Sequence, residues 1–170
     1  RSVDIAKARG DLLNEVRLLG PLFFYYLRSG EFKVCLAHAR RSAEIASELN
    51  DPAATALAHT LLGIVLTIMG DLGEARSELD AALEAVAISP ASRRIHFGFD
   101  HNSWIRIARI TALCLLGDPA QARANIEEEF KAVEGINHPV ALAIVINSAA
   151  ALLWIGDLVA AGAHLDWFIS

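Results

Sequence analysis

The chain has 170 residues, of which 54% are hydrophobic, and a formal net charge of -5. Because affinity for nucleic acid comes largely from clustered Lys and Arg, an acidic chain with only 15 such residues is a poor candidate for binding DNA or RNA. The length suits one domain or one solenoid segment. Runs rich in Ala, Leu and Ile, too long for strands, predict an almost entirely α-helical fold.

The first half of the chain is expected to form helices separated by short turns. Gly20-Pro21 lies inside one of them, and proline there predicts a kink or a break. Asn50-Asp51-Pro52 combines a helix stop, a cap and a first-turn proline. The expected segments are the end of a helix at 1–9 closed by Gly10, then helices from Asp11 to Ser29, Glu31 to Leu49, Ala53 to Met69 and Leu72 to Ile88.

The second half opens with the least regular stretch of the chain, from Ser89 to about Asn102, where we expect an extended or short-helix connection. The helices expected after it run from Ser103 to Leu116, from Asp118 to near Gly135, from Asn137 to Gly156 and from Asp157 onward. Across the chain, nearly uncharged helices alternate with charged ones. This alternation predicts a solenoid with an inner helix layer and a solvated outer layer.

A turn motif recurs four times, with a glycine followed five residues later by Ala or Cys. The copies are Gly30 with Cys35, Gly70 with Ala75, Gly117 with Ala122 and Gly156 with Ala161. Around Gly70, the pattern of small and large apolar residues resembles the tetratricopeptide repeat, with a departure at the aromatic position, which is Leu66. The residues at the five positions of the pattern are Gly63, Leu66, Ala75, Leu79 and Ala82, and all but Leu66 match it.

This resemblance implies an all-α fold, a right-handed superhelical α-solenoid of antiparallel helix pairs with about four repeats. The turn glycines are 40, 47 and 39 residues apart, longer than the family's usual spacing. A single repeat domain over 1–170 is expected. Its parts would be 1–9 as the end of a preceding repeat, 11–49, 52–88, 90–135 with the irregular connection at 89–102, and 137–170 as a truncated fourth repeat.

Two phrases carry a wider resemblance, Arg94 to Asp100 before a helix ending at Gly117, and Gly135 to Pro139. They look like the C-terminal repeat region of bacterial signalling ATPases, whose effector is a winged-helix domain or a nucleotide cyclase. The resemblance implies a fragment of a cytoplasmic transcriptional regulator that acts as a non-catalytic sensor or protein-interaction scaffold. A stand-alone adaptor bridging proteins, or the repeat region of a nucleotide cyclase, is the alternative.

In tetratricopeptide domains the concave surface is built by inner-helix residues before each turn glycine. Transferred to this chain, these positions form an apolar surface whose only basic residue is Arg17. Such a groove suits a hydrophobic peptide, an amphipathic helix or another domain of the same protein; the alternative is that these side chains pack against neighbouring repeats. The candidate groove residues are Arg17, Phe24, Leu27, Leu57, Ile64, Trp104, Ile107, Ile146 and Leu153.

Basic residues cluster in and after the irregular connection. Several precede or begin a helix, where hydrogen-bond donors could meet an anion. Alternatively, they solvate the connection and pair with Asp100 or with acidic outer helices. The candidate anion cluster is Arg93, Arg94, His96, His101, Arg106 and Arg109.

Catalytic and cofactor motifs are not found in the sequence. It has no Walker-type glycine loop, no GxSxG and no HExxH, so we expect no cofactor and no catalytic residue. An enzyme site in the basic connection is the remaining alternative. His96 and His101, five apart, are a weak metal pair, and the only two cysteines, Cys35 and Cys114, are expected to be buried reduced thiols.

The remaining expectations concern partners. The apolar runs Pro52 to Gly70 and Ile136 to Gly156 approach the length of a membrane span, but both end at the turn motif and suit inner solenoid helices, so no membrane contact is expected. Both ends of the chain look cut. A solenoid without polar caps exposes apolar faces, and we therefore expect self-association through an end helix.

Overall fold

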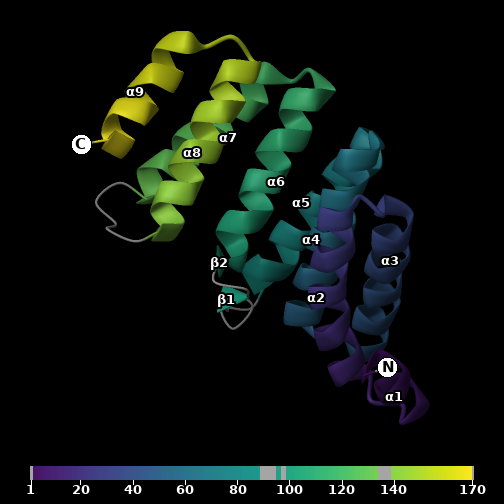
Figure 1. Cartoon of the computed structure of the whole chain (residues 1–170). Helices are drawn as coiled ribbons and strands as arrows, with labels where there is room; N and C mark the ends of the chain where they lie inside the picture. The colour runs from purple at the N-terminus through teal and green to yellow at the C-terminus, as the bar shows by residue number, and fades with distance from the viewer. Residues whose placement is uncertain (1, 89–94, 97–98, 134–138, 170) are drawn as a thin grey trace. The chain divides into compact units, whose positions relative to one another are not determined.

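The computed structural model describes residues 2–88, 95–96, 99–133 and 139–169. Within these ranges the chain forms nine helices and one short hairpin, and the helices pack as sequential antiparallel pairs (Figure 1). The predicted all-α class is confirmed. The chain divides into two compact units, residues 1–93 and 94–170, which are described separately below.

The first unit contains five helices, each packed against the next along the chain, with an additional contact between α2 and α4. Their boundaries agree with the predicted ones to within two residues. The helices are α1 (Ser2–Ala8), α2 (Leu12–Ser29), α3 (Phe32–Leu49), α4 (Pro52–Met69) and α5 (Leu72–Ile88).

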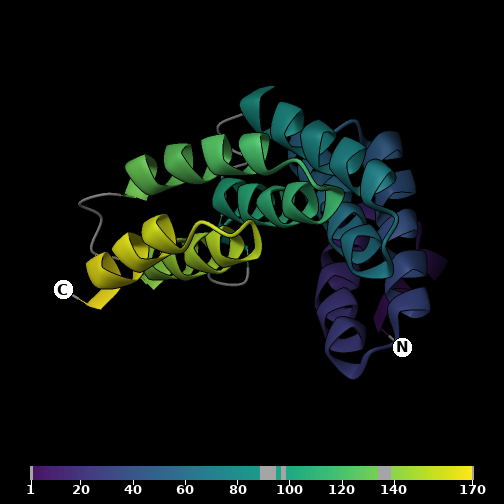
Figure 2. The same cartoon turned by 90° about the horizontal axis from the view of Figure 1, so that it is seen from above.

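The second unit begins with a hairpin of two-residue strands, β1 (Ile95–His96) and β2 (Phe99–Asp100), paired antiparallel. Residues 95–96 and 99–100 of the predicted irregular connection are thus extended, which is one of the two predicted alternatives, whereas its last two residues, His101 and Asn102, already belong to α6. Four helices follow, and α8 packs against α6, α7 and α9 (Figure 2). They are α6 (His101–Leu116), α7 (Pro119–Val133), α8 (Pro139–Trp154) and α9 (Leu158–Ile169).

The predicted turn motif has one hydrogen-bonding pattern throughout. At Gly70, with φ of 90°, the glycine N–H donates to Thr67 O (3.3 Å) and the Asp71 N–H donates to Leu66 O (3.0 Å). This pair of bonds closes a helix only when the residue at the glycine position is left-handed, which glycine adopts without a Cβ penalty. The same two bonds recur at Gly10, Gly30, Gly117 and Gly156.

Four of the following helices begin at an aspartate cap. The Asp11, Asp118 and Asp157 carboxylates each accept a hydrogen bond from the backbone N–H three residues later. At the junction between α3 and α4, Asn50 takes the left-handed place, with φ of 49°, and Asp51 caps α4 through Ala53 N at 3.0 Å. Each cap satisfies a helix N–H that has no partner within the helix.

Gly20-Pro21 does not break its helix, since α2 runs unbroken from Leu12 to Ser29. Of the two predicted alternatives, a kink or a break, the break is therefore excluded. Proline clashes with the Cβ and N–H of the residue before it, and Gly20 has no Cβ. Gly20 is buried while Pro21 is exposed, so the missing backbone hydrogen bond lies at the water-facing side of the helix, where solvent can satisfy the carbonyl.

Helix α4 is the most buried element described in the first unit. It is the one described helix long and apolar enough to cross a membrane by composition, and 61% of that window is buried inside the protein. Its packing against α3 and α5 accounts for most of its apolar character, because side chains enclosed by neighbouring helices do not meet water.

Helices α4 and α5 approach each other closely at Gly63. A Cβ built on this glycine would meet Leu79 Cγ at 2.5 Å, Leu79 Cδ2 at 2.8 Å and the Ala75 carbonyl oxygen at 3.2 Å. Leu79 and Ala75 are both fully buried. These are the residues at which the sequence matched the small, alanine and large-apolar positions of the repeat pattern, so that match corresponds to a physical contact.

We expect Gly63→Ala to lower the free energy of unfolding by about 1–3 kcal/mol, because the added methyl group displaces Leu79 and meets the Ala75 backbone. Gly73→Ala is the matched control: a Cβ at this exposed helical glycine meets nothing within 4 Å, and alanine is the better helix former. Urea denaturation should show a loss for the first variant and no loss for the second. Equal midpoints would contradict the close approach.

We also expect the second unit to lose stability below about pH 6.5, the ordinary pKa of histidine. Burial lowers the pKa of His164, with partial compensation from Asp157. The neutral ring stacks on Phe130, with centroids 4.1 Å apart. As the pH falls, His164 is protonated first in the unfolded chain, because its pKa is lower in the folded protein. The stability that the neutral ring contributes is therefore complete above the unfolded pKa and is lost as the pH falls below it.

This pH effect can be measured as the free energy of unfolding between pH 7.5 and about 5. His164→Gln should flatten the decline, because the glutamine side chain does not titrate. His38→Gln makes the same test in the first unit, where burial also lowers the pKa of His38. An unchanged pH slope in the His164 variant would refute the assignment.

Candidate functional site

The candidate groove residues of the first unit lie on α2 and α4, which contact each other. Arg17 is exposed, Phe24, Leu27 and Ile64 are half-buried, and Leu57 is buried. Phe24 makes an edge-to-face contact with Phe23, with ring centroids 5.3 Å apart. The structure thus places these predicted residues on two adjacent helices, and three of the apolar ones keep part of their surface open.

The polar groups at the α4 groove positions bond to their own helix. Thr60 Oγ1 donates to Ala56 O at 2.6 Å, and Thr67 Oγ1 donates to Gly63 O at 2.7 Å. Each hydroxyl proton is thereby used within the helix. The surface that remains has mainly apolar chemistry, as the sequence indicated.

In the second unit the candidate groove residues lie on α6 and α8. Trp104 and Ile107 are half-buried, and Ile107 packs on Ile144 and Val145. Ile146 and Leu153 are 46% and 49% exposed. The Ile107 side chain therefore packs on the next helix pair, as in the alternative interpretation of the groove residues. The two α8 residues instead face solvent.

The candidate anion cluster is described only in part. Arg93 and Arg94 lie outside the described residues. His96 is in β1 and His101 is the first residue of α6, and only their backbones are described. Arg109 Nη1 donates to Asn125 Oδ1 at 2.7 Å, which ties this guanidinium to α7.

Arg106 is held by two carboxylates of α7. Its Nη1 atom lies 2.9 Å from Glu128 Oε1 and 3.0 Å from Glu129 Oε1, and Glu129 is buried. Burial by itself would lower the pKa of Arg106, but the two carboxylates raise it overall. This guanidinium neutralises the protein's own acidic residues, as in the alternative interpretation of the basic cluster.

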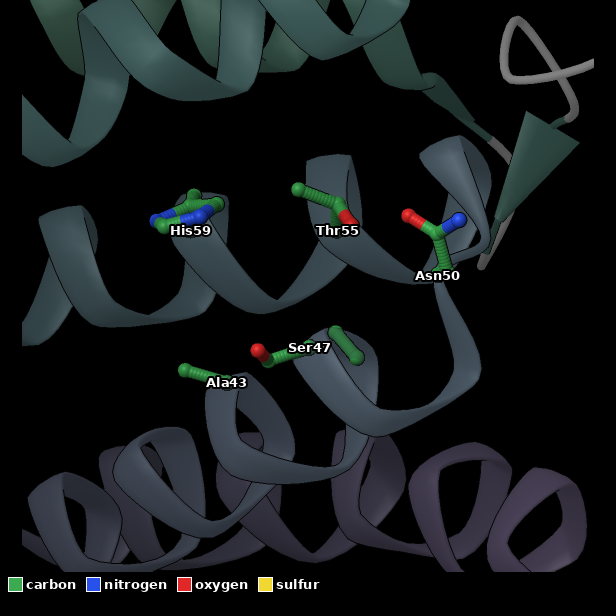
Figure 3. Close-up of a pocket in the computed structure, with 6 residues that line it drawn as sticks. Ala43, Ser47, Asn50, Thr55 and His59 are labelled. Carbon is green, nitrogen blue, oxygen red and sulfur yellow. The ribbon is translucent and has the colours of Figure 1, made fainter.

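A polar hollow that the sequence did not predict lies between α3 and α4 (Figure 3). Ala43 and Ser47 line it from α3, Thr55 and His59 line it from α4, and Asn50 lies at the turn between the helices. Its volume is about 370 Å³, and Ala46 completes the lining. Two hydroxyls, an amide and an imidazole could hydrogen-bond a small polar ligand.

His59 in this hollow is paired with α5, since its Nδ1 atom lies 2.5 Å from Glu78 Oε2. A carboxylate in this place favours a proton on Nδ1, which leaves Nε2 able to accept a hydrogen bond. A histidine in the apolar run 53–69 was the only sequence signal. Nothing in the sequence pairs it with Glu78, 19 residues later, before the helices are docked.

The two cysteines are free thiols. Cys35 is buried, as predicted, and its Sγ donates to Phe23 O at 3.4 Å; Cys114 is only half-buried. Burial raises the pKa of both thiols. Both therefore stay protonated near neutral pH and are poor nucleophiles. Among the described residues, no group of three or more His, Cys, Asp or Glu side chains could hold a metal ion.

We expect Arg106→Met to cost about 3 kcal/mol of stability, because it leaves the buried Glu129 carboxylate without this cation. Glu128→Gln is the control: this partner is 64% exposed, so its loss should cost no more than about 1 kcal/mol. Thermal and urea unfolding would measure both variants. A stable Arg106 variant with weakened binding of inorganic phosphate would instead favour the anion-site interpretation.

Comparison with known proteins supplies no family, since no family model, curated protein or solved structure matches the chain.

Proposed function

We propose that the chain is a non-catalytic protein-interaction scaffold, built as a right-handed solenoid of tetratricopeptide-like repeats. The recurrent turn and the close approach at Gly63 support the repeat assignment. The proposed binding surface is the pair of adjacent inner helices α2 and α4, with Phe24, Leu27 and Ile64 half-open beside the exposed Arg17.

The chemistry of this surface favours an amphipathic helix or a hydrophobic peptide as the ligand. Partly open aromatic and aliphatic side chains on two neighbouring helices form ridges against which a helix can place residues at spacings of three and four. Burial of apolar area would supply most of the affinity. Arg17 at the edge would favour a ligand carrying a carboxylate near its apolar face.

The wider proposal places the scaffold in a larger cytoplasmic signalling ATPase that acts as a transcriptional regulator. Binding of a peptide or of another domain of the same protein would favour one state of the ATPase over another. A stand-alone adaptor or the repeat region of a nucleotide cyclase is the alternative. A Walker motif encoded upstream would support the ATPase; an initiating Met shortly before Arg1 and a stop shortly after Ser170 would favour the adaptor.

The binding surface is tested with fluorescein-labelled amphipathic helical peptides that carry Leu at positions i, i+3, i+4 and i+7. We expect the protein to bind a subset of them, and Leu27→Glu with Ile64→Glu to weaken binding at least about tenfold, or about 1.4 kcal/mol. Ile88→Glu, at a 75% exposed residue of α5, is the control for a glutamate placed outside the proposed surface and should bind as the wild type does.

Fluorescence anisotropy gives the dissociation constants, and far-UV circular dichroism verifies that each variant is folded. Binding that is equally strong in the folded double variant, or absent from the wild-type protein across the peptide set, would refute this surface.

A further inference from the structure

The hollow between α3 and α4 lies where two successive helix pairs meet, since α3 ends one pair and α4 begins the next (Figure 3). The apolar part of its lining is alanine. Ala46 belongs to a buried cluster with Ala54 and Ala58, and Ala43 packs against that cluster. Because these side chains are short, they leave between the two helices a space that larger residues would fill.

Two hydroxyls in this hollow are not used by their own helices. Within the described residues, the Ser47 and Thr55 hydroxyls make no hydrogen bond to the protein, and neither does the Asn50 side chain. Their donors and acceptors are therefore available to a ligand. By contrast, five other hydroxyls donate to a carbonyl three or four residues earlier in their own helix, namely those of Ser29, Ser42, Thr60, Thr67 and Thr111.

Asn50 stands in a place that this fold otherwise gives to glycine. It follows the last residue of α3 with φ of 49°, and in the described part of the chain it is the one residue other than glycine with a positive φ. Glycine adopts this conformation with less strain than asparagine does. A departure from the local rule that places an amide in a hollow points to a use for that amide. The described turns with glycine in this place are those at Gly10, Gly30, Gly70, Gly117 and Gly156.

The charges around the hollow favour an uncharged ligand. None of its described lining residues is Asp, Glu, Lys or Arg. The nearby Glu78 carboxylate is already paired, since its Oε2 atom lies 2.5 Å from His59 Nδ1, and Nε2 is the ring atom left for a ligand. An ionised ligand would therefore lose hydration without gaining a counter-ion from the lining.

We propose that this hollow is a binding site for a small uncharged carboxamide. The Asn50 side chain presents a carbonyl oxygen and an NH₂ group side by side, and a primary carboxamide presents the complementary pair, so two parallel hydrogen bonds can form. Ser47, Thr55 and His59 supply partners for the remaining donor and acceptor of the ligand. The volume of about 370 Å³ is at the lower end of the range of pockets that hold small molecules.

This binding site goes beyond the proposed scaffold function. None of its lining residues belongs to the proposed peptide surface on α2 and α4, so either proposal can fail without the other. The ligand contacts both α3 and α4, and its binding would therefore also stabilise the packing of the two helix pairs by mass action.

Heteronuclear NMR of the isotope-labelled protein tests the proposal with probes that share a benzene ring: benzamide, benzoate, benzylamine and benzyl alcohol. We expect benzamide to shift the backbone amide signals of Ser47, Asn50 and Thr55 saturably, with a dissociation constant of about 1–10 mM. The charged probes should cause no saturable shift there. Benzyl alcohol has no paired donor and acceptor, so it should bind at least about fivefold more weakly than benzamide.

Asn50→Gly removes the amide and introduces the residue that the left-handed turn prefers, so this variant should fold and bind benzamide at least about fivefold more weakly. Thr55→Val is a second variant that removes a hydroxyl from the hollow. Thr111→Val, at another half-buried threonine, is the matched control and should bind as the wild type does.

Benzamide that causes no saturable shift at the hollow overturns the proposal. Equally strong binding of benzoate, benzylamine or benzyl alcohol overturns the assignment to a carboxamide. Folded Asn50→Gly and Thr55→Val variants that both bind benzamide as the wild type does overturn the assignment to this hollow.

Discussion

The left-handed turn between consecutive helices is the constraint on which the rest of the structure depends. The glycine N–H donates to the carbonyl three residues before it, and the N–H of the next residue donates to the carbonyl four residues before the glycine. These two hydrogen bonds end the helix and fix the direction in which the chain turns back. After Gly10, Gly117 and Gly156, an aspartate then begins the next helix by accepting a hydrogen bond from one of its free N–H groups. With the reversal fixed, the small residues at Gly63 and Ala75 come opposite each other, and Leu79 fills the space that the missing side chain leaves.

Polar contacts between the two helices of a pair also fix how far one helix can slide along the other. The buried Glu15 of α2 binds Arg41 of α3 at 2.8 Å, His59 of α4 binds Glu78 of α5, and Arg106 of α6 binds Glu129 of α7. A buried ion pair such as Arg41–Glu15 or Arg106–Glu129 contributes little net stability, since its attraction is largely offset by desolvation, but it penalises any sliding that separates its members. In the α2/α3 pair the acidic partner lies on the first helix, whereas in α4/α5 and α6/α7 it lies on the second.

Local signals explain why helix boundaries could be predicted. Glycine at the left-handed position, aspartate at the cap and proline at the first turn act within a few residues, so Asn50-Asp51-Pro52 was interpretable without any tertiary context. The sequence left open whether Pro21 kinks or breaks its helix, because the outcome depends on burial: the missing donor is tolerated on an exposed side of the helix. The hairpin at 95–100 has strands of two residues, too short for an alternating pattern to be recognised.

Contacts across helices were the part that the sequence did not determine. Arg106 belonged to a basic cluster along the chain, yet in the fold it faces Glu129, 23 positions later. The hollow around Ser47 and His59 forms only when α3 and α4 pack together, and no sequence spacing of its lining residues predicts it. The candidate groove residues were chosen only by the helix face on which they lie. Their exposure varies from the buried Leu57 to the exposed Leu153, because neighbouring helices cover them unequally.

The placement of Cys35 lets the first unit report on its own opening. Cys35 is enclosed in that unit, and burial raises the pKa of its thiol. A thiol-specific reagent can modify Cys35 only when α2 and α3 separate, so its rate of modification measures the equilibrium of that local opening. Cys114 in the second unit is only half-buried, so its rate of modification serves as the reference for a thiol that is already partly accessible. The protein thus carries both a probe of local opening and an internal reference, without an attached label.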